Sequence, residues 1–91
     1  MNSETDPESP LEFPCQFPIK AFGKSTENLD SIIVEIILRH VPDLREGAIK
    51  TRSSRGGKYT AVTITIQATS KQQLDAIYQD LTICPEVIMA L

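Results

Sequence analysis

Residues 58–68 alternate between apolar and polar side chains, and this pattern constrains the fold more than any other feature of the chain. Val62, Ile64 and Ile66 share one side of the segment. The other side is small or polar, with Ala61, Thr63, Thr65 and Gln67. Such alternation is typical of an antiparallel strand with one face on a hydrophobic core and the other toward solvent. We therefore expect a two-layer α+β domain.

Two amphipathic helices are predicted, one on each side of this strand in the sequence. The first has Ser25 or Thr26 as its expected cap and ends at Pro42. Its apolar face holds Leu29, Ile33, Ile36, Ile37 and His40, with Ile32 beside them. Ser70 and Gln73 form a capping box that opens the second helix, and Pro85 marks its end. The core-facing positions of this helix are Leu74, Ile77, Tyr78 and Leu81.

Three further segments are predicted to be strands: 17–22, 48–53 and 87–91. Proline cannot donate a backbone hydrogen bond, so Pro18 is placed at the beginning of the first strand, with 19–22 as the paired part and Gly23 as its end. Residues 54–57 have turn chemistry. The order βαββαβ with right-handed crossovers predicts a ferredoxin-like two-layer sandwich, with an antiparallel sheet of order 4-1-3-2 and both helices on one face.

The N-terminal residues 1–10 are polar, acidic and contain two prolines, so we predict a disordered acidic tail followed by a single domain over 11–91. The tail lacks a basic region and an apolar region, which excludes a secretory signal. The longest apolar run, 36–38, is far too short to span a membrane. We expect a cytoplasmic protein with no membrane contact.

Neither a metal site, a cofactor site nor a catalytic constellation is predicted. Cys15 and Cys84 form no C-x-x-C pair, and no Cys/His spacing suits zinc. A disulfide between them stays open, although isolated cysteines are more often reduced and partly buried. His40 has no obvious catalytic partner, and Cys15 has no adjacent base. We expect no enzymatic activity, and a small enzyme with an unrecognised site stays as an alternative.

The predicted hairpin over 45–58 is basic in an otherwise acidic protein. It carries a net charge of +4, from Arg45, Lys50, Arg52, Arg55 and Lys58 against Glu46. One interpretation is a contact surface for phosphate, nucleic acid or an acidic protein. The other is a solvated hairpin whose charge protects an edge strand from pairing. The contact residues predicted here are Arg52, Arg55, Lys58 and Tyr59.

A second candidate anion site lies at Gly23, Lys24 and Ser25. The stretch Gly23–Thr26 is similar to the end of a phosphate-binding P-loop, but Pro18 occupies the position of the first glycine, which excludes nucleoside triphosphate hydrolysis. The free N–H groups of a following helix would suit an anion. The alternative is a glycine turn and a hydroxyl cap with Lys24 solvated.

The outer face of the long strand allows two interpretations. RNA-recognition domains of this fold stack bases on aromatic side chains, and only Tyr59 could serve here, so nucleic acid is the lesser alternative as a partner. The small residues Ala61, Thr63 and Thr65 could be hydrated or could let a second copy approach. We expect a monomer or a weak homodimer.

Several segments resemble the YbeD-like family of small uncharacterised bacterial proteins. They are the opening 11–14 and 17–20 with Gly23, the hairpin 53–66, and 73–74, 77–78, Leu81 and 87–91. The resemblance covers 11–91, with Ala61 where the family pattern has Ser. It implies a ferredoxin-like fold similar to ACT-type regulatory domains, which bind small effectors at subunit interfaces. It implies no established activity and no catalytic residue.

These observations lead to one functional hypothesis and its alternatives. The chain is expected to be a non-enzymatic regulatory or adaptor domain that binds a partner protein or a small anionic metabolite. Nucleic-acid binding through the basic hairpin and a small enzyme are the alternatives.

Overall fold

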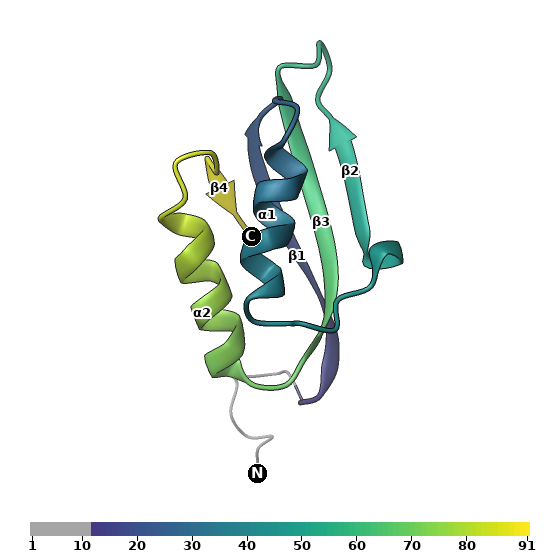
Figure 1. Cartoon of the computed structure of the whole chain (residues 1–91), viewed down its shortest axis with the longest axis vertical. Helices are drawn as coiled ribbons and strands as arrows, with labels where there is room; N and C mark the ends of the chain where they lie inside the picture. The colour runs from purple at the N-terminus through teal and green to yellow at the C-terminus, as the bar shows by residue number, and fades with distance from the viewer. Residues whose placement is uncertain (1–11) are drawn as a thin grey trace.

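The computed structural model describes residues 12–91 as one four-stranded antiparallel sheet covered by two helices (Figure 1). The elements in chain order are β1 (Cys15–Lys24), α1 (Leu29–Leu38), a 3₁₀ turn (Glu46–Ala48), β2 (Ile49–Ser53), β3 (Tyr59–Ala68), α2 (Lys71–Thr82) and β4 (Met89–Ala90). The sheet order is β2-β3-β1-β4, which confirms the ferredoxin-like βαββαβ fold. The tail predicted over 1–10 lies outside the described residues.

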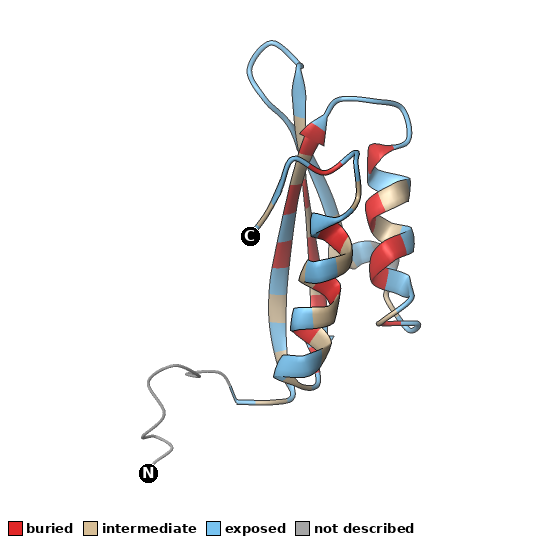
Figure 2. Ribbon diagram, turned by 90° about the vertical axis from the view of Figure 1, so that its left-hand side faces the viewer, coloured by how far each residue is buried: buried red, intermediate tan, exposed pale blue. Residues whose placement is uncertain are grey.

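β3 follows the predicted alternation. Val62 and Ile64 are fully buried and Ile66 is nearly so, while Ala61 and Thr63 on the other side remain partly exposed. Both helices lie on the same side of the sheet (Figure 2). The apolar side of β3 is therefore the floor of the core.

β1 is longer than predicted, because its pairing with β3 runs from Cys15 to Lys24 with Pro18 inside it. Lys20 exchanges both backbone hydrogen bonds with Leu91, so its N–H points toward β4 and away from β3. Residues two apart in a strand point their backbone groups the same way, so the nitrogen of Pro18 also faces the β4 side. There β4 pairs with β1 only at Ala21 and Phe22, so Pro18 breaks no ladder bond.

α1 begins later than predicted, at Leu29, and Asn28 precedes it without a side-chain cap. The proposed cap at Ser25 or Thr26 is therefore wrong. The Ser25 hydroxyl bonds the Thr60 hydroxyl at 2.7 Å, and the Thr26 hydroxyl donates to the Asn28 side chain at 3.3 Å. Both hydroxyls are used before the helix starts.

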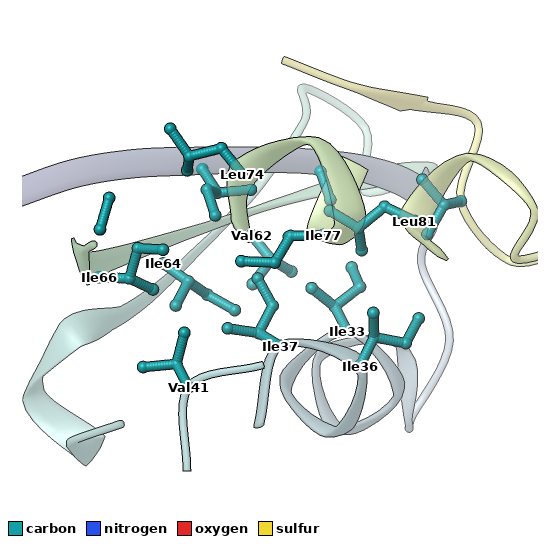
Figure 3. Close-up of a cluster of buried hydrophobic side chains, with 14 of the residues drawn as sticks. Ile33, Ile36, Ile37, Val41, Val62, Ile64, Ile66, Leu74, Ile77 and Leu81 are labelled. Atoms are coloured by element: carbon teal, nitrogen blue, oxygen red, sulfur yellow. The ribbon is translucent and has the colours of Figure 1, made fainter. Parts of the chain in front are cut away.

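α2 has the predicted cap at Ser70, whereas the return bond of the predicted capping box goes to Thr69, one residue earlier. The Gln73 backbone N–H donates to the Ser70 hydroxyl at 3.0 Å, and the Gln73 side-chain oxygen accepts from the Thr69 N–H at 2.8 Å. The core lies between this helix, α1 and the sheet. Figure 3 shows Ile33 and Ile37 of α1 beside Ile77 of α2, all three fully buried.

The β2–β3 hairpin turns at Gly56 and Gly57, whose φ angles are +86° and +75°. Residues other than glycine rarely adopt this left-handed backbone conformation, so the two glycines determine the shape of the turn. The turn projects beyond the end of the sheet (Figure 1). No helix of residues 12–91 is long and apolar enough to cross a bilayer.

Candidate functional site

The sheet has an open face, the side turned away from both helices, and among residues 12–91 no helix or strand covers it (Figure 2). Directly opposed residues of an antiparallel pair share a face, so the register fixes its members. They are Gln16, Pro18, Lys20, Phe22 and Lys24 of β1, Lys50 and Arg52 of β2, Tyr59, Ala61, Thr63, Thr65 and Gln67 of β3, and Met89 of β4.

All charged side chains of the strands are cations on this open face: Lys20, Lys24, Lys50 and Arg52. None of the four strands contains an Asp or a Glu. All four cations are exposed to solvent. The two helices carry the acids instead: Asp30, Glu35, Asp75 and Asp80. The domain is thus positive on the sheet side and acidic on the helix side.

The four cations of the open face have no ion pair with any carboxylate whose side chain the structure describes, in contrast to cations on the helix side. Arg39 lies 3.8 Å from Glu35, and Lys71 lies 3.2 Å from Asp75. Uncompensated like charges on one surface create a positive potential that attracts anions. The open face is therefore the strongest candidate for an anion-binding surface.

Two aromatic rings lie among these cations. Tyr59 is directly opposite Lys24, and Phe22 is directly opposite Ala61, so the two rings are diagonal neighbours on β1 and β3. Tyr59 is 45% exposed and Phe22 is partly exposed. The sequence alone indicated only Tyr59, but alternation from the buried Ile19 directs Phe22 outward as well.

A groove of about 610 Å³ continues the open face at the far end of β3. It forms because β2 pairs with β3 only as far as Ile64, which leaves the edge of β3 without a strand partner from Thr65 onward. Gln16, Lys50, Thr65 and Gln67 of the open face line it, together with Arg45, the acidic Asp43 and the apolar Leu44. A volume of this size is within the range of ligand pockets.

The structure divides the predicted hairpin residues. Arg52 and Tyr59 lie on the open face, whereas Arg55 lies in the exposed turn. Lys58 is exposed just before β3, and its carbonyl accepts the Ser25 N–H at 2.9 Å. Lys58 precedes β3 and is not among the paired residues that make up the open face. The positive surface therefore extends across the sheet to Lys20 and Lys24 rather than along the hairpin alone.

The second predicted group, Gly23 to Ser25, is also divided. Gly23 is not a turn but a buried residue of β1, where an added Cβ would lie 2.9 Å from a Leu29 methyl group and against the Glu86 carbonyl. Lys24 belongs to the open face. Ser25 bonds Thr60 and lies four positions before Leu29, where α1 begins, so these residues do not directly precede the helix; the anion site at Gly23, Lys24 and Ser25 stays a prediction.

His40 has a partner that the sequence did not reveal. Its Nε2 lies 2.7 Å from an Asp80 carboxylate oxygen, and its carbonyl accepts from the Gln73 side chain at 3.2 Å. These contacts join the end of α1 to α2, far along the sequence. Cys15 and Cys84 are both free and partly buried. No three His, Cys, Asp or Glu side chains of the described part form a metal-ligand group.

Comparison with known proteins identifies relatives across almost the whole chain. A family model described as a protein of unknown function (DUF493) matches residues 8–91. The UPF0250 protein NE1487 of Nitrosomonas europaea is 45% identical over 92% of this chain and 97% of its own. A UPF0250 protein of Chromobacterium violaceum is 46% identical over 89% and 91%.

A solved structure supports the fold. The solution structure of protein HP0495 from H. pylori matches with a TM-score of 0.69 and covers 96% of this chain and 92% of that chain. Its sequence is 13% identical, so this likeness concerns the fold alone. The sequence matches settle the family, and the resemblance to YbeD-like proteins is confirmed: this chain belongs to the DUF493 (UPF0250) family of small bacterial proteins.

Proposed function

We propose that this protein is a non-enzymatic cytoplasmic regulatory or adaptor domain that binds an anionic partner on the open face of its sheet. The observation that carries the proposal is the distribution of charge over the strands. Four cations and no carboxylate occupy one exposed face of a protein whose net charge is −3. Such an asymmetry orients an approaching anion toward the sheet and away from the helices.

The composition of the face supports binding rather than catalysis. Its members are cations, amides, hydroxyls, small residues and rings, and it has no Cys, His, Asp or Glu. The Lys, Thr and Tyr side chains of the face can act as acids, bases or nucleophiles only when a neighbouring group activates them, and the face offers no Cys, His, Asp or Glu for that task. His40 is engaged with Asp80, and Cys15 packs against the core. A regulatory role in the manner of ACT-type domains, which share this fold, fits a face that binds and does not transform.

The test is a titration of ¹⁵N-labelled protein with an oligoglutamate of about ten residues and separately with inorganic pyrophosphate. We expect the amide shifts to cluster on β1, β2 and β3 and to weaken as salt rises. The double variant Lys20→Glu, Arg52→Glu should weaken binding by about tenfold or more, because each reversal replaces an attraction with a repulsion.

The matched control is the double variant Arg39→Glu, Lys71→Glu, which changes the net charge equally but on the helix side. Those cations are in surface ion pairs that contribute little to stability. Binding of either probe should be unchanged in this variant. Shifts that cluster on the helices, or equal losses in both double variants, would refute the proposed site.

A further inference from the structure

We infer that the anionic partner is a single-stranded nucleic acid, which lies along β1 and β3 with bases stacked on Phe22 and Tyr59. This inference rests on the proposed function and names its partner. The sequence made nucleic acid the lesser alternative because the chain is acidic and because Tyr59 was the only available ring, with no stacking platform at Ala61, Thr63 and Thr65. The register places Phe22 on the same face as Tyr59, and the acids lie on the helices instead of on the strands.

The two rings provide a stacking platform. Phe22 belongs to β1 and Tyr59 to β3, the two central strands of the sheet, and both rings are at least partly exposed. Every base has a π face, so exposed aromatic side chains on a sheet bind single strands with little dependence on sequence. Two rings at diagonal positions of one face, Tyr59 exposed and Phe22 partly exposed, suit two successive bases.

The cations surround this platform where phosphates would pass. Lys24 lies across from Tyr59, and Ala61 lies between Arg52 of β2 and Phe22 of β1. Lys20 and Lys50 both lie opposite Thr63, one from each neighbouring strand. The open-face side chains of β3 next to these cations, Ala61, Thr63 and Thr65, are small, so a nucleic-acid strand can lie flat on the sheet. This arrangement combines a positive track with stacking rings.

Beyond Thr65 the nucleic-acid strand would enter the groove at the end of β3. Gln16 and Gln67 are opposed on neighbouring strands, and both line the groove. Each glutamine amide can donate and accept hydrogen bonds. The edges of unstacked bases carry both acceptors and donors, so the two amides can bond to them. Arg45 and Lys50 line the same groove and outnumber Asp43, the acid that also lines it, so the two cations can hold a further phosphate.

An acidic peptide is a weaker match for the same face. Its carboxylates would use the cations, but it would gain nothing specific from the exposed rings of Phe22 and Tyr59. A duplex is also a weaker match, because its bases are already stacked and proteins recognise it by shape and backbone. The rings therefore favour a single strand over either of these partners.

The test measures fluorescence anisotropy of oligouridylate and oligothymidylate of about ten nucleotides, with a duplex of the same length and the oligoglutamate as comparisons. We expect the single strands to bind more tightly than the duplex. With four cations on the face and Arg45 in the groove, the logarithm of affinity should fall with the logarithm of salt concentration with a slope of about −3.5 at most.

Separate variants distinguish stacking from charge. Tyr59→Leu and Phe22→Leu should each weaken single-strand binding by about tenfold while leaving the salt slope unchanged. Lys24→Gln should reduce the slope by about 0.7. Lys71→Gln, on α2, is the control and should change neither quantity. Tyr59 is exposed, so its variant should fold as the wild type does, and thermal unfolding of each variant checks this.

The outcomes separate this inference from the proposed function. If the oligoglutamate or pyrophosphate binds the open face and the single strands do not, the inference is overturned and the proposed function stands. Duplex binding as tight as single-strand binding, or full affinity in both leucine variants, also overturns it. If none of the probes binds, both are overturned.

Discussion

Gly23 lies where β1 passes close to α1 and to the segment that leads into β4. An added Cβ would lie 2.9 Å from a Leu29 methyl group and would meet the Glu86 carbonyl, which belongs to the backbone and cannot turn away. Overpacking of this kind costs about 1–3 kcal/mol. We expect Gly23→Ala to lower the free energy of unfolding in urea by that amount.

Gly47 provides the matched control for Gly23, because a Cβ there would meet nothing within 4 Å. Gly47→Ala should change the free energy of unfolding by no more than about 0.5 kcal/mol. Equal effects at the two positions would contradict the steric explanation of Gly23.

Single residues show what sequence patterns can and cannot predict. Val62 and Ile64 were assigned to the core correctly because the period of a strand is a local property. Gly23 was assigned to a turn because glycine serves both turns and close backbone approaches, and only the packed structure distinguishes them. Asp80 could not be assigned to His40, because 40 positions separate them in the chain.

At the scale of elements, local signals decided which predictions were accurate. α2 has its cap and its apolar face in adjacent positions, and it was predicted closely. The start of α1 was missed because the Ser25 hydroxyl bonds Thr60 across the sheet instead of capping the helix. The predicted β1 was too short because Pro18 was expected to lie outside the paired part. Proline is acceptable inside β1 because its nitrogen faces the β4 side, where no strand residue pairs with it. Both errors come from contacts that are distant in the sequence.

The cap of α2 gives a test at this scale. Ser70→Ala removes the acceptor of the Gln73 N–H and leaves a helix-end donor without its side-chain partner. Loss of such a cap costs about 1 kcal/mol, so the midpoint of thermal unfolding should fall by about 4–8 °C. Ser31→Ala, at an exposed position of α1, is the control and should leave the midpoint nearly unchanged. A fall of the same size in both variants would contradict the capping role.

At the scale of the whole molecule, the candidate site depends on pairing register. The sequence predicted a basic hairpin, and its candidate contact residues Arg52 and Tyr59 both lie on the open face, where their role stays a prediction. Lys20 and Phe22 were not predicted as contact residues. Which residues of two strands share a face depends on how the strands pair, and that pairing is not visible in either segment alone. The separation of sheet-side cations from helix-side acids is therefore a property of the fold and not of any one segment.

Tyr78 joins the helix layer to the sheet and gives the molecule a dependence on alkaline pH. Its hydroxyl donates to the Leu91 backbone oxygen at 2.6 Å, and its ring meets Phe17 edge-on at 6.4 Å. Burial raises the pKa of Tyr78 above its ordinary value of 10.0, because the phenolate is poorly solvated there. Below pH 10 both the folded and the unfolded chain keep this proton.

Above pH 10 the unfolded chain releases the Tyr78 proton first, so the free energy of unfolding falls as pH rises toward and through the raised pKa. Tyr78→Phe should cost about 1 kcal/mol at neutral pH, because it loses the bond to Leu91. It should also lose less stability than the wild type between about pH 9 and 11, so the two curves converge. Urea unfolding across this range measures both effects. Tyr59→Phe should keep the wild-type dependence because Tyr78 remains, and parallel curves for wild type and Tyr78→Phe would show that the phenol of Tyr78 is not the group responsible.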